Sequence, residues 1–252
     1  MNVFLTGASS GIGQALAREF AARGARLGLV ARRAAPLEAL ARELGGRHLV
    51  YPVDVTERAA LVDAARGFDA DSGGADIVIA CAGISDGIDT ADERDLDVLR
   101  EILAVNVVAL ATTFHPVIAP MRARGRGTLV GIGSVAGIRG LPGSGGYCGS
   151  KAAAMTYCES LRVELRGSGI RVVTIAPGFV RTPMTFRNPY PMPFLMDAAP
   201  FARRAVGAIL ARRSYAVIPW QMGVVAKLLR LLPNPVYDAG VAGRQRKPRR
   251  GD

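Results

Sequence analysis

Tyr147 and Lys151 stand four residues apart in a segment whose pattern predicts a helix over residues 147–165. Side chains with this spacing lie on the same face of a helix, so the phenol and the ammonium group can meet. A phenol ionises near pH ~10, and a nearby cation favours the phenolate and lowers its pKa. The pair therefore predicts an acid/base device that exchanges protons near neutral pH.

A glycine-rich turn lies close to the start of the chain, between an apolar run at residues 3–5 and a helical pattern at residues 14–23. Glycines allow close backbone approach, and a helix N-terminus offers free N–H donors and partial positive charge. The turn therefore predicts a cradle for the phosphates of a nucleotide; the alternative is that its glycines only let the helix pack on the strand. The predicted contacts are Gly7, Ser9, Ser10, Gly11, Ile12 and Gly13.

Two arginines, Arg32 and Arg33, follow the second predicted strand at residues 27–30. NAD sites usually carry a carboxylate here for the ribose hydroxyl, whereas NADP sites use arginine for the 2′-phosphate. The absence of a carboxylate beside two guanidinium groups predicts NADP(H). The alternative is a solvated helix start.

Apolar strands alternate with helical patterns along most of the chain. The predicted strands are 3–5, 27–30, 48–53, 77–80, 128–132, 171–175 and 215–218, and the main helices are 14–23, 37–44, 57–68, 92–124 with a bend near Asn106, and 147–165. This order predicts right-handed crossovers and a parallel sheet covered on both faces. We expect a Rossmann-type, doubly wound α/β sheet of about seven strands in three layers. No linker or repeat divides residues 1–252, which predicts a single domain.

Composition narrows the remaining choices. The formal charge of +11 would attract phosphates, anionic lipid surfaces or nucleic acid. The three cysteines lack the spacing of metal ligands, so we expect no metal site. Their small odd number suits a reducing cytoplasm, and Met1 runs directly into an apolar strand without a charged leader. These features predict a cytoplasmic protein.

In this order, the motifs resemble the short-chain dehydrogenase/reductase family over nearly all of residues 2–182. They are Thr6-Gly7-x-x-x-Gly11-x-Gly13, Asp54-Val55, Ala82-Gly83, Asn106, Ser134, Tyr147-x-x-x-Lys151 and Pro177-Gly178-x-x-x-Thr182. One departure is Cys81, where the family often has asparagine, and it would loosen a local hydrogen bond without touching the chemistry.

The resemblance implies a role for most of these positions toward the cofactor. Asp54 and Val55 would hold the adenine ring, and Ala82 with Gly83 would pack beside the cofactor. Pro177 and Gly178 belong to the same motif as Val180 and Thr182, which would contact the nicotinamide carboxamide.

The resemblance also implies the catalytic roles. In reduction, Tyr147 would donate a proton to the carbonyl oxygen, and Ser134 would hydrogen-bond the same oxygen. Lys151 would hold the phenol in its acidic range and bind the nicotinamide ribose, while Asn106 would position a water that links Lys151 to solvent. The alternatives are an Asn106 that only bends its helix, a Ser134 that caps a strand end and a Tyr147–Lys151 surface pair.

Substrate specificity is expected between residues 182 and 200, with a lid over residues 183–200 and an opposite wall at residues 138–144. The lid sequence is proline-broken and apolar, which predicts a cavity for a hydrophobic carbonyl compound or alcohol. The alternative is that its apolar residues only pack the lid onto the domain. These residues are Phe186, Tyr190, Met192, Phe194, Leu195 and Met196.

The C-terminal extension, residues 219–252, leaves three alternatives open. An apolar face with interspersed lysine and arginine can lie on an anionic membrane. By family analogy it can form a subunit interface, and we expect a homo-oligomer, a dimer or a tetramer. A solvated basic tail is the third alternative, and we expect residues 240–252 to be mobile. The acidic residues Asp89, Asp92, Glu93, Asp95 and Asp97 are expected to decorate a helix start, where negative charge suits the dipole.

The sequence is compatible with three classes of function. The first is an NADP(H)-dependent oxidoreductase that interconverts a carbonyl compound and an alcohol. The second is a catalytically idle NADP-sensing or regulatory protein on the same fold, which would have no need of a proton relay. The third is a nucleic-acid binder, suggested only by charge, and the chain lacks the recognition helix or interleaved aromatics that would support it. We therefore predict the enzyme, and no nucleic-acid partner.

Overall fold

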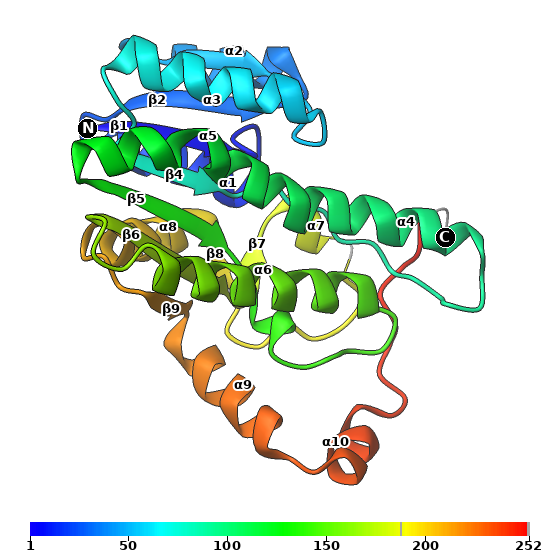
Figure 1. The fold of residues 1–252 in the computed structure, drawn as a ribbon. Helices are drawn as coiled ribbons and strands as arrows, with labels where there is room; N and C mark the ends of the chain where they lie inside the picture. The colour runs from blue at the N-terminus through cyan, green and yellow to red at the C-terminus, as the bar shows by residue number, and fades with distance from the viewer. Residues whose placement is uncertain (187, 251–252) are drawn as a thin grey trace.

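The computed structural model describes residues 1–186 and 188–250, and its centre is a parallel seven-stranded sheet in the order β3-β2-β1-β4-β5-β6-β9 (Figure 1). The predicted Rossmann-type sheet is confirmed. Its strands are β1 (Asn2–Thr6), β2 (Arg26–Ala31), β3 (Leu49–Pro52), β4 (Ile77–Ala80), β5 (Gly127–Ile132), β6 (Ile170–Pro177) and β9 (Tyr215–Ile218). The order reverses between β1 and β4, which places a crevice for ligands at the carboxyl ends of these two strands.

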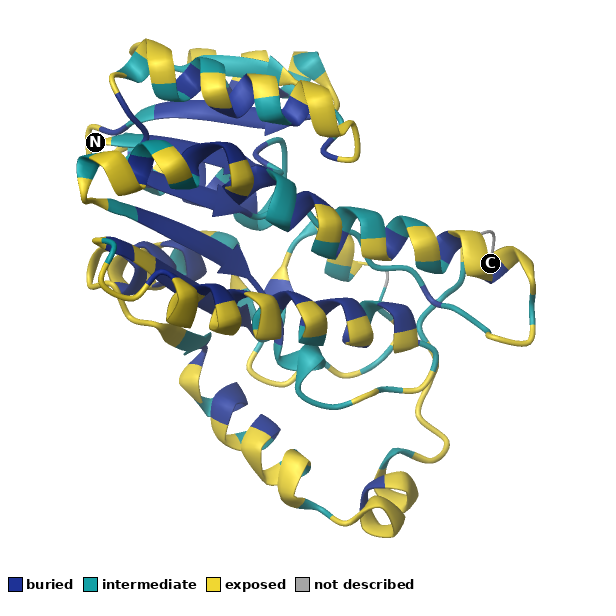
Figure 2. Cartoon of the chain, viewed as in Figure 1, coloured by how far each residue is buried: buried dark blue, intermediate teal, exposed yellow. Residues whose placement is uncertain are grey.

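Helices cover both faces of the sheet, so the strands read as nearly continuous apolar runs. One core lies between the sheet and α1 (Gly11–Ala21), α2 (Ala34–Leu44) and α8 (Ala198–Leu210), and includes Phe20 and Phe201. The other core lies under α3 (Arg58–Ser72), α5 (Ala109–Arg124) and α6 (Gly145–Glu164), and includes Phe68 and Phe114. The predicted three layers are therefore present (Figure 2).

An irregular turn of the long helix lies where the sequence predicts a bend, at Asn106. A π-helical turn, η1 (Ala104–Val108), joins α4 (Arg94–Leu103) to α5 and buries Asn106. By length and composition alone, the helical stretch 94–124 could span a membrane, since its mean hydropathy reaches 1.9; 44% of that apolar window is buried inside the protein. Helix α5 packs on α3 and β4 and is therefore a core helix of this fold.

The segment after β6 contains β7 (Val180–Arg181), α7 (Pro183–Phe186) and β8 (Met196–Asp197). Phe186 is 90% exposed and Phe194 is 50% exposed, so the prediction that these two rings line an apolar cavity is wrong. Tyr190 packs its ring 6.4 Å from that of Phe179, as the packing alternative expects. Proline-broken backbone makes the segment follow the surface, which leaves some apolar rings in solvent.

Helices α9 (Trp220–Leu231) and α10 (Asn234–Val241) extend away from the sheet (Figure 1). Met222 and Ala226 are buried, while the other face of α9 is exposed. The exposed face consists of Trp220, Val224, Leu228 and Leu231. Membrane contact and subunit contact through this face both stay predictions.

The tail beyond α10 corrects a prediction. Residues 246–250 lie against the loop before α4 and are held there by ion pairs, so the mobile tail expected from the sequence is wrong up to residue 250. Complementary charge, which composition alone does not locate in space, is the physical reason. The predicted mobility of residues 251 and 252 lies outside the described residues.

Candidate active site

The glycine turn lies at the carboxyl end of β1 and begins α1. Gly7 and Gly11 have φ angles of +72° and +55°, a region that disfavours side chains. A Cβ on Gly7 would lie 2.9 Å from the backbone of Ala82, so the loops after β1 and β4 touch. No side chain caps the first turn of α1, and its N–H groups are therefore available to an anion.

A buried threonine ties these two loops together. The Thr6 hydroxyl oxygen accepts hydrogen bonds from the backbone N–H groups of Cys81 (3.1 Å) and Ala82 (3.2 Å). Because Thr6 is 1% exposed, these bonds are shielded from water. The floor of the crevice is therefore fixed by the protein itself.

The far end of the cleft carries positive charge. The Arg32 guanidinium lies 3.9 Å from the Asp54 carboxylate, and both side chains are substantially exposed. Asp54 also accepts hydrogen bonds from the backbone and hydroxyl of Thr56, at 2.9 Å and 2.8 Å. Arg33, at the start of α2, is exposed beside them. A weak, solvent-screened ion pair leaves Arg32 free to exchange its partner for a phosphate.

These features surround one cleft with a volume of about 380 Å³. Every residue predicted to hold the cofactor lines it except Asn106. The lining includes Gly7, Ser9, Ser10, Gly11, Ile12, Gly13, Arg32, Arg33, Asp54, Val55, Ala82, Gly83, Ser134, Tyr147, Lys151, Pro177, Gly178, Val180 and Thr182. The sequence did not predict Ile84 as a lining residue, because it carries no motif; Met184 and Thr185 belong to the predicted lid but were not singled out within it.

Tyr147 lies in the first turns of α6 and is partly exposed to the cleft. Burial raises the pKa of Tyr147 to about 12, and the Ser134 hydroxyl offsets this rise in part. The predicted lowering of this pKa is not found for the protein by itself, because desolvation is the largest influence on the phenol. The phenol stays protonated at neutral pH, which suits a proton donor to a carbonyl oxygen.

Ser134 follows β5, and its position makes it both a cap and a cleft residue. It is 7% exposed, and its hydroxyl oxygen accepts a hydrogen bond from the backbone N–H of Ala136 (3.1 Å). That bond fixes the oxygen and leaves its own proton available. The capping alternative and a role in the cleft are compatible.

Lys151 is 5% exposed and donates a hydrogen bond from Nζ to the Ile132 carbonyl oxygen at 2.9 Å. Burial lowers the pKa of Lys151 to about 8. Its Nζ lies 5.9 Å from the centre of the Tyr147 ring, so the pair that the spacing predicts is formed inside the protein and not on its surface.

Asn106 lies behind the cleft wall. Its Oδ1 accepts from the Ile84 N–H at 2.9 Å, and its Nδ2 donates to the Ile84 carbonyl oxygen at 3.0 Å and to the Ser150 hydroxyl at 2.9 Å. A Cβ on Gly83 would lie 3.2 Å from Asn106 Oδ1 and 3.4 Å from Lys151 Nζ. Asn106 therefore holds the loop after β4 beside Lys151, and its role toward a water stays a prediction.

Sequence reasoning missed Lys247. Its Nζ lies 5.5 Å from the centre of the Tyr147 ring and donates to the Ser85 hydroxyl at 2.6 Å. The signal that could have found it is the match between an acidic stretch at residues 86–101 and a basic stretch at residues 244–250.

The site fits a dinucleotide on observations made here. The uncapped start of α1 and the crowded glycines form a cradle for a pyrophosphate, and Arg32 and Arg33 lie where a ribose phosphate would be neutralised. Tyr147 and Ser134 lie at the other end of the cleft.

Comparison with known proteins agrees with this geometry. The family described as short chain dehydrogenase matches residues 1–189. An uncharacterized oxidoreductase of Myxococcus xanthus is 42% identical over 238 residues, which cover 93% of this chain and 94% of that protein.

Two solved structures share the fold. A short-chain dehydrogenase from Sphingobium yanoikuyae in complex with NADPH has a TM-score of 0.80 and 27% identity, covering 97% of this chain and 96% of the other. A 3-ketoacyl-(acyl-carrier-protein) reductase from Brucella melitensis complexed with NADH has a TM-score of 0.76 and 26% identity, covering 86% and 94%.

Proposed function

Because the chain belongs to the short-chain dehydrogenase/reductase family, whose members oxidise alcohols or reduce carbonyl groups, we propose that it is an NADP(H)-dependent enzyme interconverting a carbonyl compound and an alcohol. The observation that carries the proposal is the presence of Tyr147, Ser134 and Lys151 in the same cleft as the glycine turn and Arg32. A protein that only sensed a nucleotide would have no use for the first three.

The preference for NADP(H) over NAD(H) is supported by charge. Arg32 and Arg33 line the cleft, and Asp54 is the carboxylate nearest to Arg32 among the described ion pairs. Bidentate guanidinium contacts would hold a 2′-phosphate, whereas the Thr56 bonds keep Asp54 occupied. One neighbour binds NADPH and another NADH, so the argument depends on this chain's own arginines.

When bound, the dinucleotide supplies or accepts the hydride. Tyr147, protonated at neutral pH, gives its hydroxyl proton to the substrate oxygen in reduction and takes it back in oxidation. Ser134 donates a hydrogen bond to the same oxygen and fixes its position. Lys151 stabilises the phenolate left after proton donation and would hold the nicotinamide ribose. Such assistance typically contributes about 10²–10⁴ in rate.

The substrate is proposed to have an apolar body. The cleft lining includes the side chains of Ile84, Val105 and Met184, which offer no hydrogen bonds to a polar chain. The test is a panel of ketones, aldehydes and alcohols, assayed with NADPH, NADP, NADH and NAD by absorbance of the reduced nicotinamide. Turnover with NADPH of at least one apolar ketone is expected; cofactor binding without any turnover would favour the sensing alternative.

A further inference from the structure

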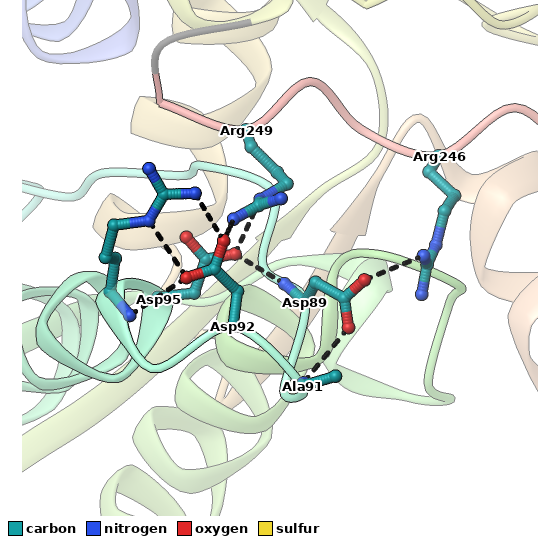
Figure 3. A network of polar contacts seen from close by, with 7 residues as sticks. Asp89, Ala91, Asp92, Asp95, Arg246 and Arg249 are labelled. Atoms are coloured by element: carbon teal, nitrogen blue, oxygen red, sulfur yellow. Dashed lines mark hydrogen bonds and ion pairs between the residues drawn. The ribbon is translucent and has the colours of Figure 1, made fainter.

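Residues 246–250, here called the basic strap, bind acidic residues of α4 and of the loop before it (Figure 3). Gly87 donates its N–H to the Pro248 carbonyl oxygen at 2.9 Å and forms a parallel bridge with Arg249. Because both backbone and side chains take part, the register of the strap on the loop is defined. Its ion pairs join Arg246 to Asp89 (3.4 Å), Arg249 to Asp95 (2.7 Å) and Asp92, and Arg250 to Asp86 (2.8 Å) and Glu101 (2.6 Å).

On the acidic side of this contact, Asp95 is buried and hydrogen-bonded to the backbone of the loop before α4. Asp95 is 5% exposed and accepts the Asp89 backbone N–H at 2.6 Å in addition to the Arg249 guanidinium. A buried carboxylate with one charged partner requires that partner to stay in place. Ion pairs of Arg246 and Arg249 therefore fix the strap on both sides of Lys247 and Pro248.

Lys247 differs from its neighbours in the strap. In the part of the chain that the structure describes, it has no carboxylate within ion-pair distance, and its Nζ donates to the neutral Ser85 hydroxyl at 2.6 Å. Ser85 follows Ile84, a residue of the cleft wall. The same Nζ lies 5.5 Å from the centre of the Tyr147 ring. A partly buried ammonium group is thus held beside the Tyr147 ring, with no carboxylate of the described residues in ion-pair contact.

We propose that Lys247 determines substrate specificity by binding a carboxylate group of the carbonyl or alcohol substrate, an inference that rests on the oxidoreductase function proposed above. The reacting oxygen must lie at the Tyr147 hydroxyl, so a second group on the same small molecule comes within reach of Lys247. An anion there would form a charge-assisted hydrogen bond in a partly desolvated place, whereas an uncharged group would leave the ammonium uncompensated. The preferred substrate then combines an apolar body with an acidic end.

The kinetic test compares a keto acid with its amide, which has the same shape without the charge. The wild type is expected to show the higher kcat/KM for the acid. Lys247→Met should lower kcat/KM for the acid by about 10–100-fold more than for the amide, the range of a hydrogen bond to a charged group. Lys247→Arg should retain part of the preference, and Lys227→Met, an exposed lysine of α9, should retain all of it.

A binding measurement keeps the test independent of turnover. Calorimetry with benzoate and benzamide, on the protein loaded with NADP, should show tighter binding of benzoate to the wild type and no such difference in Lys247→Met. Thermal unfolding of each variant identifies one that fails to fold, and Lys247→Gln then replaces it.

Different results would overturn the proposed oxidoreductase reaction and the proposed carboxylate contact of Lys247. If Tyr147→Phe turns over ketones normally, the proposed reaction is wrong while benzoate binding still reports on Lys247. If ketones are reduced in a Tyr147-dependent way but acid and amide behave alike in the wild type, or lose equally in Lys247→Met, the carboxylate proposal is overturned.

Discussion

The Nζ of Lys151 lies 5.9 Å from the centre of the Tyr147 ring, so the two groups interact through space and not through a direct hydrogen bond. The one hydrogen bond described for this ammonium goes to the Ile132 carbonyl oxygen. Burial dominates both groups, because it raises the pKa of Tyr147 and lowers that of Lys151.

Removing the phenolic hydroxyl should abolish proton transfer and leave the fold intact. Tyr147→Phe is expected to lower kcat by about 10²–10⁴-fold with unchanged cofactor affinity. Steady-state kinetics and fluorescence titration with NADPH measure the two effects. Tyr157→Phe, on the same helix and 38% exposed, is the matched control and should behave as wild type. Comparable turnover by both variants would remove Tyr147 from the mechanism.

Reversing charge at the cofactor rim should change the preferred dinucleotide. Arg32→Asp is expected to weaken NADPH binding by about 10–100-fold, since a charge-assisted contact becomes a repulsion, and to affect NADH much less. Dissociation constants for both cofactors check this. Arg42→Asp makes the same charge change at an exposed site on α2 and should alter neither constant. If Arg32→Asp weakens the binding of NADPH and NADH equally, Arg32 does not contact the 2′-phosphate.

The buried Lys151 should make stability depend on pH. Its pKa is about 8 in the folded protein against 10.5 for the free side chain, so the unfolded chain binds more protons between these values. Stability should therefore rise with pH through this window. Relative to Lys151→Met, the unfolding free energy of wild type should increase by on the order of 3 kcal/mol between pH 7.5 and 10.5.

Urea denaturation of both proteins at several pH values measures this difference, in which other titrating groups cancel. A flat difference would show that the ammonium keeps its ordinary pKa inside the protein.

Gly7 and Gly24 distinguish two reasons for which a position requires glycine: left-handed backbone, and a close backbone neighbour. Gly7 has φ +72° and a backbone neighbour 2.9 Å from a hypothetical Cβ, whereas Gly24 has φ +75° and open space. Gly24→Ala should cost about 1–2 kcal/mol of stability, the penalty of left-handed backbone alone. Gly7→Ala should cost more and also weaken NADPH binding, because the loop after β4 must move. Similar effects from both variants would indicate that the close approach to Ala82 is unimportant.

The sheet was predictable because parallel buried strands are continuous apolar runs and glycine punctuates the turns. The irregular helical turn at Asn106 was also predictable as an interruption, since a polar residue there divides a long helical pattern. The pKa of Tyr147 was not, because spacing gives the proximity of Lys151 and says nothing of desolvation. The placement of Phe186 in solvent was missed because apolar composition does not tell a lining residue from an exposed one.

The match between acidic residues 86–101 and basic residues 244–250 can suggest that the tail is bound, but the place of Lys247 beside Tyr147 required the tertiary structure. A run of basic residues predicts a solvated tail as readily as a bound one, and only the carboxylates in the loop before α4 and in its first turn decide between them. Such a pairing joins parts of the chain that lie far apart in sequence, and it has no periodicity that a sequence pattern could reveal.

The way the tail arginines are engaged changes what the formal charge of +11 means. Arg246, Arg249 and Arg250 already face carboxylates of their own chain and act as its internal counterions. Polyanions that approach from outside, such as a lipid bilayer or a nucleic acid, would first have to displace those carboxylates. Much of the surplus positive potential therefore originates on other faces of the protein, and within the described part of the cationic tail it is Lys247, rather than these three arginines, that is left without an ion-paired carboxylate.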